Sequence, residues 1–168
     1  ITTLYSKRNL VSITNNNIQT AVDEWVADPT TAEAKYGHIS NWDTSQVTSM
    51  FQLFYNKSTF NDDISSWNVS NVTNMQQIFR NATSFNQDIG GWNVANVTDM
   101  RKLCMDATSF NQDLPWTTSS LTDMHETFRN ATSFNGDVST WDTSQVVQMG
   151  NLFSGAHAFN RDISAWNV

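Results

Sequence analysis

Five Asn-x-Asp pairs recur along the chain, and their side-chain oxygens are its clearest candidates for chemistry. Carboxylate and amide oxygens repeated once per structural unit could hold calcium, as they do in some repeat proteins. Alternatively, the Asn side chains form a ladder between repeats while the Asp side chains face water. We therefore predict no cofactor, with calcium as the one candidate exception. The candidate calcium ligands are Asn61 and Asp63, Asn86 and Asp88, Asn111 and Asp113, Asn135 and Asp137, Asn160 and Asp162.

Catalytic motifs are missing from the sequence. The three histidines, His38, His125 and His157, fall at different repeat phases. There is no glycine-rich phosphate loop, nucleophile elbow or His-x-x-x-His pair. The sequence thus predicts a protein that is not an enzyme, with no catalytic residues.

A column of six tryptophans could form a stacking platform for sugars or belong to the core. The core is the expected place, because Trp shares an apolar set with valine and such amphipathic rings are usually buried. The column consists of Trp42, Trp67, Trp92, Trp116, Trp141 and Trp166.

One repeat has lost a residue before its tryptophan and contains a proline. Proline cannot donate a hydrogen bond to a strand ladder, so we expect a local irregularity here. A surface that breaks the repeat is the natural candidate for ligand binding. The candidate binding residues are Pro115, Trp116, Thr117 and Thr118.

Six Asn-x-Ser/Thr sequons make the chain a candidate glycoprotein if it is secreted by a eukaryote. An Asn- and Thr-rich repeat also generates such sequons by composition alone. The candidate acceptors are Asn56, Asn68, Asn71, Asn81, Asn96 and Asn130.

These groups all lie in a repeat of 24 or 25 residues. Phenylalanine recurs at 60, 85, 110, 134 and 159, and a second column reads Phe54, Phe79, Cys104, Phe128 and Phe153. We divide the chain into five full repeats and a partial sixth. Repeats one to six are 39–63, 64–88, 89–113, 114–137, 138–162 and 163–168.

The pattern within a repeat predicts one short strand and one short helix. In repeat two, Trp67 and Val69 alternate with polar residues, which is typical of a strand. Val72, Met75, Ile78, Phe79 and Ala82 then follow helical spacing. The repeat length matches leucine-rich repeats. We therefore expect an α/β repeat solenoid that is leucine-rich-repeat-like, with a β-solenoid with helical corners as the alternative.

Residues 1–38 do not follow the repeat and are expected to form a helical N-terminal cap. Ile18, Ala21, Val22 and Trp25 fall on one helical face. Thr30 with Glu33 is a candidate capping box for a second helix, which Gly37 can close. A repeat stack needs such a cap, because its first unit otherwise exposes an apolar end.

Composition narrows the class of protein. The chain has 168 residues, a formal net charge of −7, 39% hydrophobic and 15% charged residues. The acidic charge argues against nucleic-acid partners, and no run of apolar residues is long enough for a transmembrane segment. One Cys excludes a disulfide framework within the chain. The sequence stops inside repeat six, so we expect it to be part of a longer protein.

The stretch from Trp67 to Met75, followed by Ala82-Thr-Ser-Phe-Asn-Gln-Asp88, resembles the repeat of BspA-like surface proteins. The resemblance covers 39–168 and implies an extracellular or cell-surface location. It also implies adhesion, or interaction with a protein or glycan at a cell surface or matrix, through an extended polar solenoid surface. The alternative is a structural protein whose copies assemble into a surface layer or filament. The resemblance supplies no catalytic residues.

Overall fold

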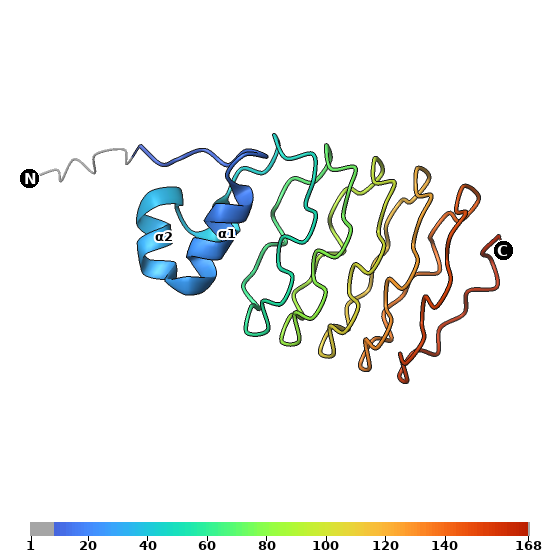
Figure 1. Cartoon of the computed structure of the whole chain (residues 1–168). Coiled ribbons are helices and arrows are strands. Elements are labelled where there is room, and N and C mark those ends of the chain that lie inside the picture. Colours follow the sequence, from blue (N-terminus) through green and yellow to red (C-terminus); the bar gives the residue numbers. More distant parts are fainter. Residues whose placement is uncertain (1–8, 168) are drawn as a thin grey trace, which may run out of the picture.

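The computed structural model describes residues 9–167 of the chain. Two helices, α1 (Ile18–Ala27) and α2 (Pro29–Tyr36), lie at one end, and a short 3-10 turn, η1 (Ile39–Asn41), follows them. From there the chain winds through successive repeats that lie side by side, up to the C-terminal end (Figure 1). The division into a cap at 1–38 and six repeats stays a prediction, and residues 1–8 and 168 lie outside the described residues.

The two helices form where the apolar spacing and the turn residues predict them. Helix α1 buries Ile18, Ala21, Val22 and Trp25 on one face. Helix α2 ends at Tyr36 and is followed by Gly37, whose φ of 80° lies in the region that favours glycine.

The start of α2 differs from the predicted capping box at Thr30. The N-cap is Asp28, whose side-chain oxygen Oδ1 accepts the amide hydrogens of Thr30 and Thr31 at 3.1 and 3.3 Å. Asp28, two residues before Thr30, is the N-cap because Pro29 fits the first helical position. This leaves Asp28 as the residue that flanks the helix.

Backbone hydrogen bonds between repeats join every second residue of one segment to the next repeat. The amides between them instead bond within the repeat, as Leu53 does to Met50 and Tyr55 does to Gln52. The pattern recurs at the four junctions between repeats one and five. In the first pair the donors Met50, Gln52, Phe54 and Asn56 reach the carbonyl oxygens of Asn74, Gln76, Ile78 and Arg80 at 2.9–3.0 Å.

This alternation makes both predicted fold classes wrong. Within residues 9–167 the only helices longer than one turn are α1 and α2, and parallel pairing is limited to isolated bridges such as Ser49 with Asn74. The expected helix of repeat two is interrupted by left-handed residues at Gln77 (φ 59°) and Asn81 (φ 60°). Left-handed backbone at the third residue of a turn is typical of type II turns. The repeats are thus neither leucine-rich-repeat-like α/β units nor coils of a β-solenoid.

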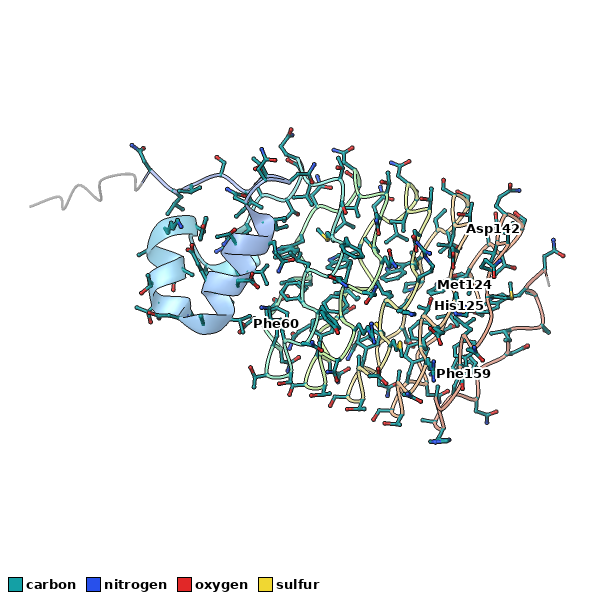
Figure 2. The ribbon with its side chains drawn as sticks, viewed as in Figure 1. Phe60, Met124, His125, Asp142 and Phe159 are labelled. Carbon is teal, nitrogen blue, oxygen red and sulfur yellow. The ribbon has the colours of Figure 1, made fainter. Side chains whose placement is uncertain are left out.

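The core consists of aromatic columns that run along the stack. Phe60, Phe85, Phe110, Phe134 and Phe159 stack with ring centroids 5.8–5.9 Å apart. Figure 2 labels the two ends of this column: Phe60 lies near the helices and Phe159 near the C-terminal end. Burying one such ring contributes roughly 1.5–3 kcal/mol, so these columns help to hold the repeats together.

The tryptophan column is also core, so its rings do not form a sugar platform. All six rings are buried, with 2–7% of their surface exposed. Except for Trp42, which donates to Gly37, each indole Nε1 donates to the first backbone carbonyl of the preceding repeat, as Trp67 does to Ile39 at 2.8 Å. The ring therefore fills the core while its polar atom ties two units together.

Candidate functional site

The repeated surface changes its chemistry on one segment of repeats three and four. The corresponding positions in repeats one, two and five carry neutral residues such as Asn74, Gln76 and Gln77, with Arg80 as the exception. We call the seven residues of this segment the charged cluster: Asp99, Arg101, Lys102, Asp123, His125, Glu126 and Arg129.

Arg101 links the two repeats within the charged cluster. Its Nη2 lies 2.7 Å from Oδ2 of Asp99, and its Nε lies 3.4 Å from Oδ2 of Asp123. The hydrogen bond with Asp99 raises the pKa of the guanidinium further above its usual value. Asp99 and Asp123 also accept the amide hydrogens of the residues two positions on, which fixes their side chains.

Glu126 is the buried carboxylate of the charged cluster, with 7% of its side chain exposed. Burial opposes its ionisation, but hydrogen bonds from Arg129 and Lys102 outweigh burial and lower the pKa of Glu126. Its Oε2 lies 3.3 Å from Nζ of Lys102 and 3.5 Å from Nε2 of His125. The lowered pKa favours the charged carboxylate, which pairs with Lys102 and Arg129 and lies beside His125.

A shallow hollow of about 330 Å³ lies over part of the charged cluster and is lined by Arg101, Asp123, His125 and Gln148. Gly150 leaves the imidazole uncovered there, because a Cβ on this residue would lie 3.2 Å from Nδ1 of His125. Figure 2 labels His125 beside Met124 in this part of the stack. The hollow offers hydrogen-bond donors and acceptors and carries both positive and negative charge. It contains no nucleophile with an adjacent base, so it suits recognition of a polar group.

The predicted binding residues of repeat four are not brought together as one surface. Pro115 and Thr117 are exposed, whereas Trp116 and Thr118 are buried. The Thr118 hydroxyl donates to the carbonyl of Asp142, the same role that Thr44 and Thr143 have in their repeats. The lost residue shortens the turn before Trp116, whose amide donates to the carbonyl of Leu114 two residues back, whereas the amide of Trp92 reaches Ile89 three residues back. Whether these four residues bind a ligand stays a prediction.

The Asn-x-Asp pairs form the ladder that was the alternative to calcium. Each Asn side-chain oxygen accepts the amide hydrogen of the next Asn in the column, as Asn61 does from Asn86 at 2.8 Å. The bonds from Asn111, Asn135 and Asn160 are 2.8–2.9 Å long. Four asparagine side-chain oxygens thus each accept one hydrogen bond from the following repeat, and calcium binding by the pairs stays a prediction.

Four of the five aspartates in these pairs close turns of their own. Asp63, Asp88, Asp137 and Asp162 each accept the amide hydrogen two residues on at 2.9 Å. Asp113 differs and accepts the amide of Asp137 at 2.8 Å. Over the part of the chain that the structure describes, no three His, Cys, Asp or Glu side chains gather as metal ligands.

The sequons differ in how far their amide nitrogens are engaged. The Nδ2 atoms of Asn71 and Asn96 donate to carbonyls of the preceding repeat at 2.8 Å. Those of Asn81 and Asn130 donate to Asn56 and Asp106 at 2.8 Å. Asn56 and Asn68 are exposed, and in residues 9–167 their Nδ2 atoms make no hydrogen bond. Asn56 and Asn68 are therefore the sterically simplest acceptors of the six candidates.

Sequence reasoning missed the charged cluster, although a signal was present. Comparing the residues at equivalent positions of successive repeats shows the change. Asn74 is replaced by Asp99 and Asp123, and Gln76 is replaced by Arg101 and His125. The missing residue before Trp116 was a more conspicuous irregularity, but the fold absorbs it in its turns.

The stacked repeats with their aromatic columns define a repeat protein. The chain belongs to the family described as Mycoplasma protein of unknown function, DUF285, whose model matches residues 20–115 and 115–168. No curated protein and no solved structure matches the chain. None of the helices within residues 9–167 has the length and apolarity needed to cross a membrane.

Proposed function

We propose that this protein acts outside the cell or on its surface, where it mediates adhesion by binding a protein or a glycan. The observation that carries the proposal is the charged cluster, because it breaks the neutral polar pattern of the stack at one place. A regular stack needs no such break for its own stability, since Gln76 and Gln77 serve at the same positions in repeat two. The resemblance to BspA-like surface repeats supports the same function and location.

The charged cluster fits recognition rather than catalysis. Arg101 and His125 present nitrogen donors, and Asp123 presents an acceptor, around one shallow hollow. Such a mixed set can hydrogen-bond the hydroxyls of a glycan or the polar side chains of a protein. The net charge of −7 disfavours nucleic acid. We therefore propose no enzymatic activity and no cofactor.

Binding to immobilised glycans and extracellular-matrix proteins tests this function. The informative variant combines Arg101→Gln and His125→Gln, since repeat two carries Gln76 at that position. We expect the variant to keep the fold and lose about tenfold or more in affinity for whichever ligand binds the native chain. Asp88→Asn, on the Asn-x-Asp column, is the matched control and should bind normally.

Equal binding by the variant and the native chain would contradict a role for the charged cluster. The alternative function is assembly of copies into a surface layer or filament. Light scattering over a wide concentration range separates the two functions. Growth in mass without binding to any immobilised ligand would favour assembly.

A further inference from the structure

One column of equivalent positions runs along the surface that carries the charged cluster. We call it the surface column, and its members in repeats one to five are Phe51, Gln76, Arg101, His125 and Gly150. Each of the first four donates its backbone amide to the side-chain oxygen of the residue two positions before it, at 2.9–3.4 Å. The same turn therefore places each of these side chains at the same point of its repeat.

Neighbouring members of the surface column lie against one another. Nη2 of Arg101 donates to Oε1 of Gln76 at 3.5 Å, and a Cβ on Gly150 would lie 3.2 Å from Nδ1 of His125. The repeats themselves are closely spaced, because equivalent phenylalanine rings stack with centroids 5.8–5.9 Å apart in the core. This spacing is of the order of the length of one sugar unit in an extended polysaccharide chain.

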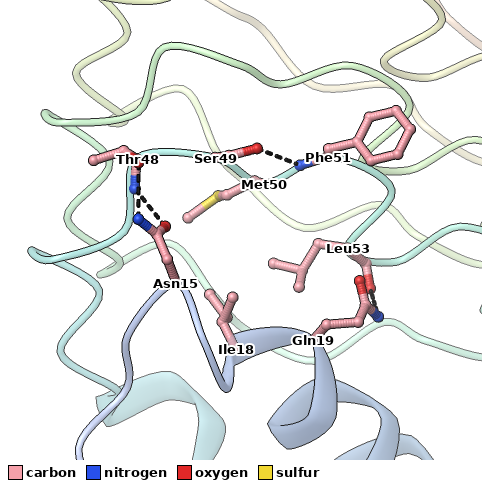
Figure 3. A pocket seen from close by; sticks show the side chains of 8 residues that line it. All are labelled: Asn15, Ile18, Gln19, Thr48, Ser49, Met50, Phe51 and Leu53. Atoms are coloured by element: carbon pink, nitrogen blue, oxygen red, sulfur yellow. Dashed lines mark hydrogen bonds between the residues drawn. The ribbon is translucent and has the colours of Figure 1, made fainter.

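An exposed aromatic ring stands at the first position of the surface column. The side chain of Phe51 is 45% exposed, and the residue lines a cavity of about 220 Å³ between α1 and repeat one. Figure 3 shows its ring beside this cavity. The turn does not require an aromatic residue here, since Gln76 and Arg101 occupy the same position in the next two repeats. An exposed ring of this kind can pack against the apolar C–H face of a sugar.

The charges around the surface column are balanced. The charged cluster contains three acidic residues and three residues that are Lys or Arg, and each carboxylate is paired with at least one basic side chain. The net charge of −7 therefore lies in the rest of the chain. An anionic ligand would be repelled by the molecule as a whole, and a cationic ligand would compete with basic side chains already in place. The surface column thus suits a ligand that is polar and uncharged.

The polar groups at the surface column match the chemistry of sugar hydroxyls. Within residues 9–167 no hydrogen bond engages Nη1 of Arg101 or the side-chain amide of Gln148. A carboxylate oxygen of Asp123 keeps a further lone pair, and a hydroxyl both donates and accepts. The hollow over Arg101 and His125 has no apolar side chain in its lining. Because the centre of a protein interface is usually apolar and aromatic, this lining favours a glycan over a protein.

We propose that the surface column binds an extended, uncharged polysaccharide chain that runs along the stack. One sugar packs on Phe51, and the following sugars hydrogen-bond Gln76, Arg101 and His125 in turn. Gly150 leaves room for the chain at repeat five. The inference rests on the proposed function of the charged cluster, and it adds the class of ligand and a contact residue outside that cluster.

Binding to immobilised neutral polysaccharides tests the ligand class. The probes are a glucan, a mannan and a galactan, each compared with its own carboxymethylated form, so that only the charge differs. We expect binding to at least one neutral polymer and weaker binding to its carboxymethylated form. Competition with oligosaccharides of that polymer should strengthen about tenfold or more from one sugar to four, because longer chains reach further positions of the column.

Phe51→Ala tests the contact that the charged cluster does not supply. The ring is half exposed, so the variant should keep the fold and lose about tenfold or more in affinity for the neutral polymer. Phe51→Tyr keeps an aromatic ring and should bind like the native chain. Leu10→Ala is the matched control, because Leu10 is also 45% exposed but lies outside the repeats.

Each alternative result overturns a definite part of the inference. Normal binding by Phe51→Ala, or equal competition by one sugar and by four, would overturn the extended site. Stronger binding to the carboxymethylated polymer would overturn an uncharged ligand, and binding to a matrix protein alone would overturn a glycan. The proposed function survives these results if Arg101→Gln with His125→Gln abolishes the binding that is seen, and it fails with the inference if that double variant binds normally.

Discussion

The side-chain oxygen of Asn15 accepts the amide hydrogen of Thr48 at 2.9 Å, and the backbone carbonyl of Thr48 accepts that of Thr73 at the same distance. One side chain therefore imitates the preceding repeat. Its Nδ2 also donates to the Thr48 hydroxyl at 2.9 Å. The column of amides that donate to the preceding repeat thus begins on a side chain that lies outside the repeats.

Replacing this side chain should destabilise the first repeat. Asn15→Ala leaves the Thr48 amide without its acceptor, and we expect the free energy of unfolding to fall by roughly 0.5–1.5 kcal/mol. Chemical denaturation measures the change. Asn16→Ala is the control, because Asn16 is exposed and, within the described chain, only its backbone amide is hydrogen-bonded. An equal loss in both variants would show that Asn15 has no special role.

The ion pair between Lys102 and Glu126 should show strong coupling. Glu126→Gln alone removes the carboxylate that holds Lys102 and Arg129, and we expect a loss of roughly 1–3 kcal/mol. Lys102→Gln with Glu126→Gln copies the pair in repeats one and two, where Nε2 of Gln52 donates to Oε1 of Gln77 at 3.3 Å.

A double-mutant cycle measures this coupling by denaturation. The double variant should be more stable than the sum of the two single losses predicts, because both partners become neutral together. Strict additivity of the two single changes would contradict the coupling. Gln76→Ala is a suitable reference for a change on the same surface outside the pair.

Acid should destabilise the fold through its turn-closing aspartates. Hydrogen bonds from Ser65 lower the pKa of Asp63, and those from Ser164 lower the pKa of Asp162. A lowered pKa in the folded state stabilises the protein above the unfolded pKa, which is about 3.9 for Asp. That stabilisation is lost as the pH falls through the folded pKa.

Thermal unfolding against pH measures this effect. We expect Tm to change little between neutral pH and about pH 5 and to fall below about pH 4. Asp63→Asn keeps an oxygen acceptor for the turn, so its Tm should fall less in acid than that of the native chain. A Tm that stays level down to pH 2–3 would refute a contribution from these carboxylates.

Cys104 should be unreactive in the folded chain. The thiol is fully buried in place of a column phenylalanine, and burial raises its pKa well above the usual value. Because the thiolate is the reactive species, a thiol reagent at pH 8 should label the unfolded chain quickly and the native chain slowly. Rapid labelling of the native chain would place Cys104 at the surface.

The residue columns predicted the core, but they did not predict the backbone. The tryptophan column and the column phenylalanines up to Phe134 are buried as expected, and α1 buries the face formed by Ile18, Val22 and Trp25. The expected helix of repeat two failed because Met75, Ile78 and Phe79 point inward equally well from a succession of tight turns. Hydrogen bonding to the neighbouring repeat decides between a helix and a succession of tight turns. The spacing of residues within one repeat carries no information on that hydrogen bonding.

The residues with positive φ show how little the local sequence indicates about the backbone conformation. Asn81 and Asn130 have a side chain that tolerates positive φ, and this could have warned against a helix. Gln77, Lys102 and Glu126 have no such preference, yet they adopt φ of 56–59°. Contacts between repeats impose their conformation, so only the stack as a whole explains it.

The asparagine ladder should stabilise the stack without metal. Asn111→Ala removes the oxygen that accepts the Asn135 amide at 2.8 Å, and we expect a loss of roughly 0.5–1.5 kcal/mol in denaturation. Thr108→Ala is the control, because this side chain is exposed and makes no hydrogen bond within residues 9–167.

Calcium and a chelator distinguish the ladder from a metal site. Asparagine oxygens that already accept amide hydrogens between repeats have less capacity to bind a cation, so neither millimolar calcium nor a chelator should shift Tm. The Asn111→Ala variant should lose the same stability with and without calcium. A rise in Tm with calcium that disappears in Asn111→Ala would show instead that these oxygens bind the ion, because a ligand that binds the folded state stabilises it.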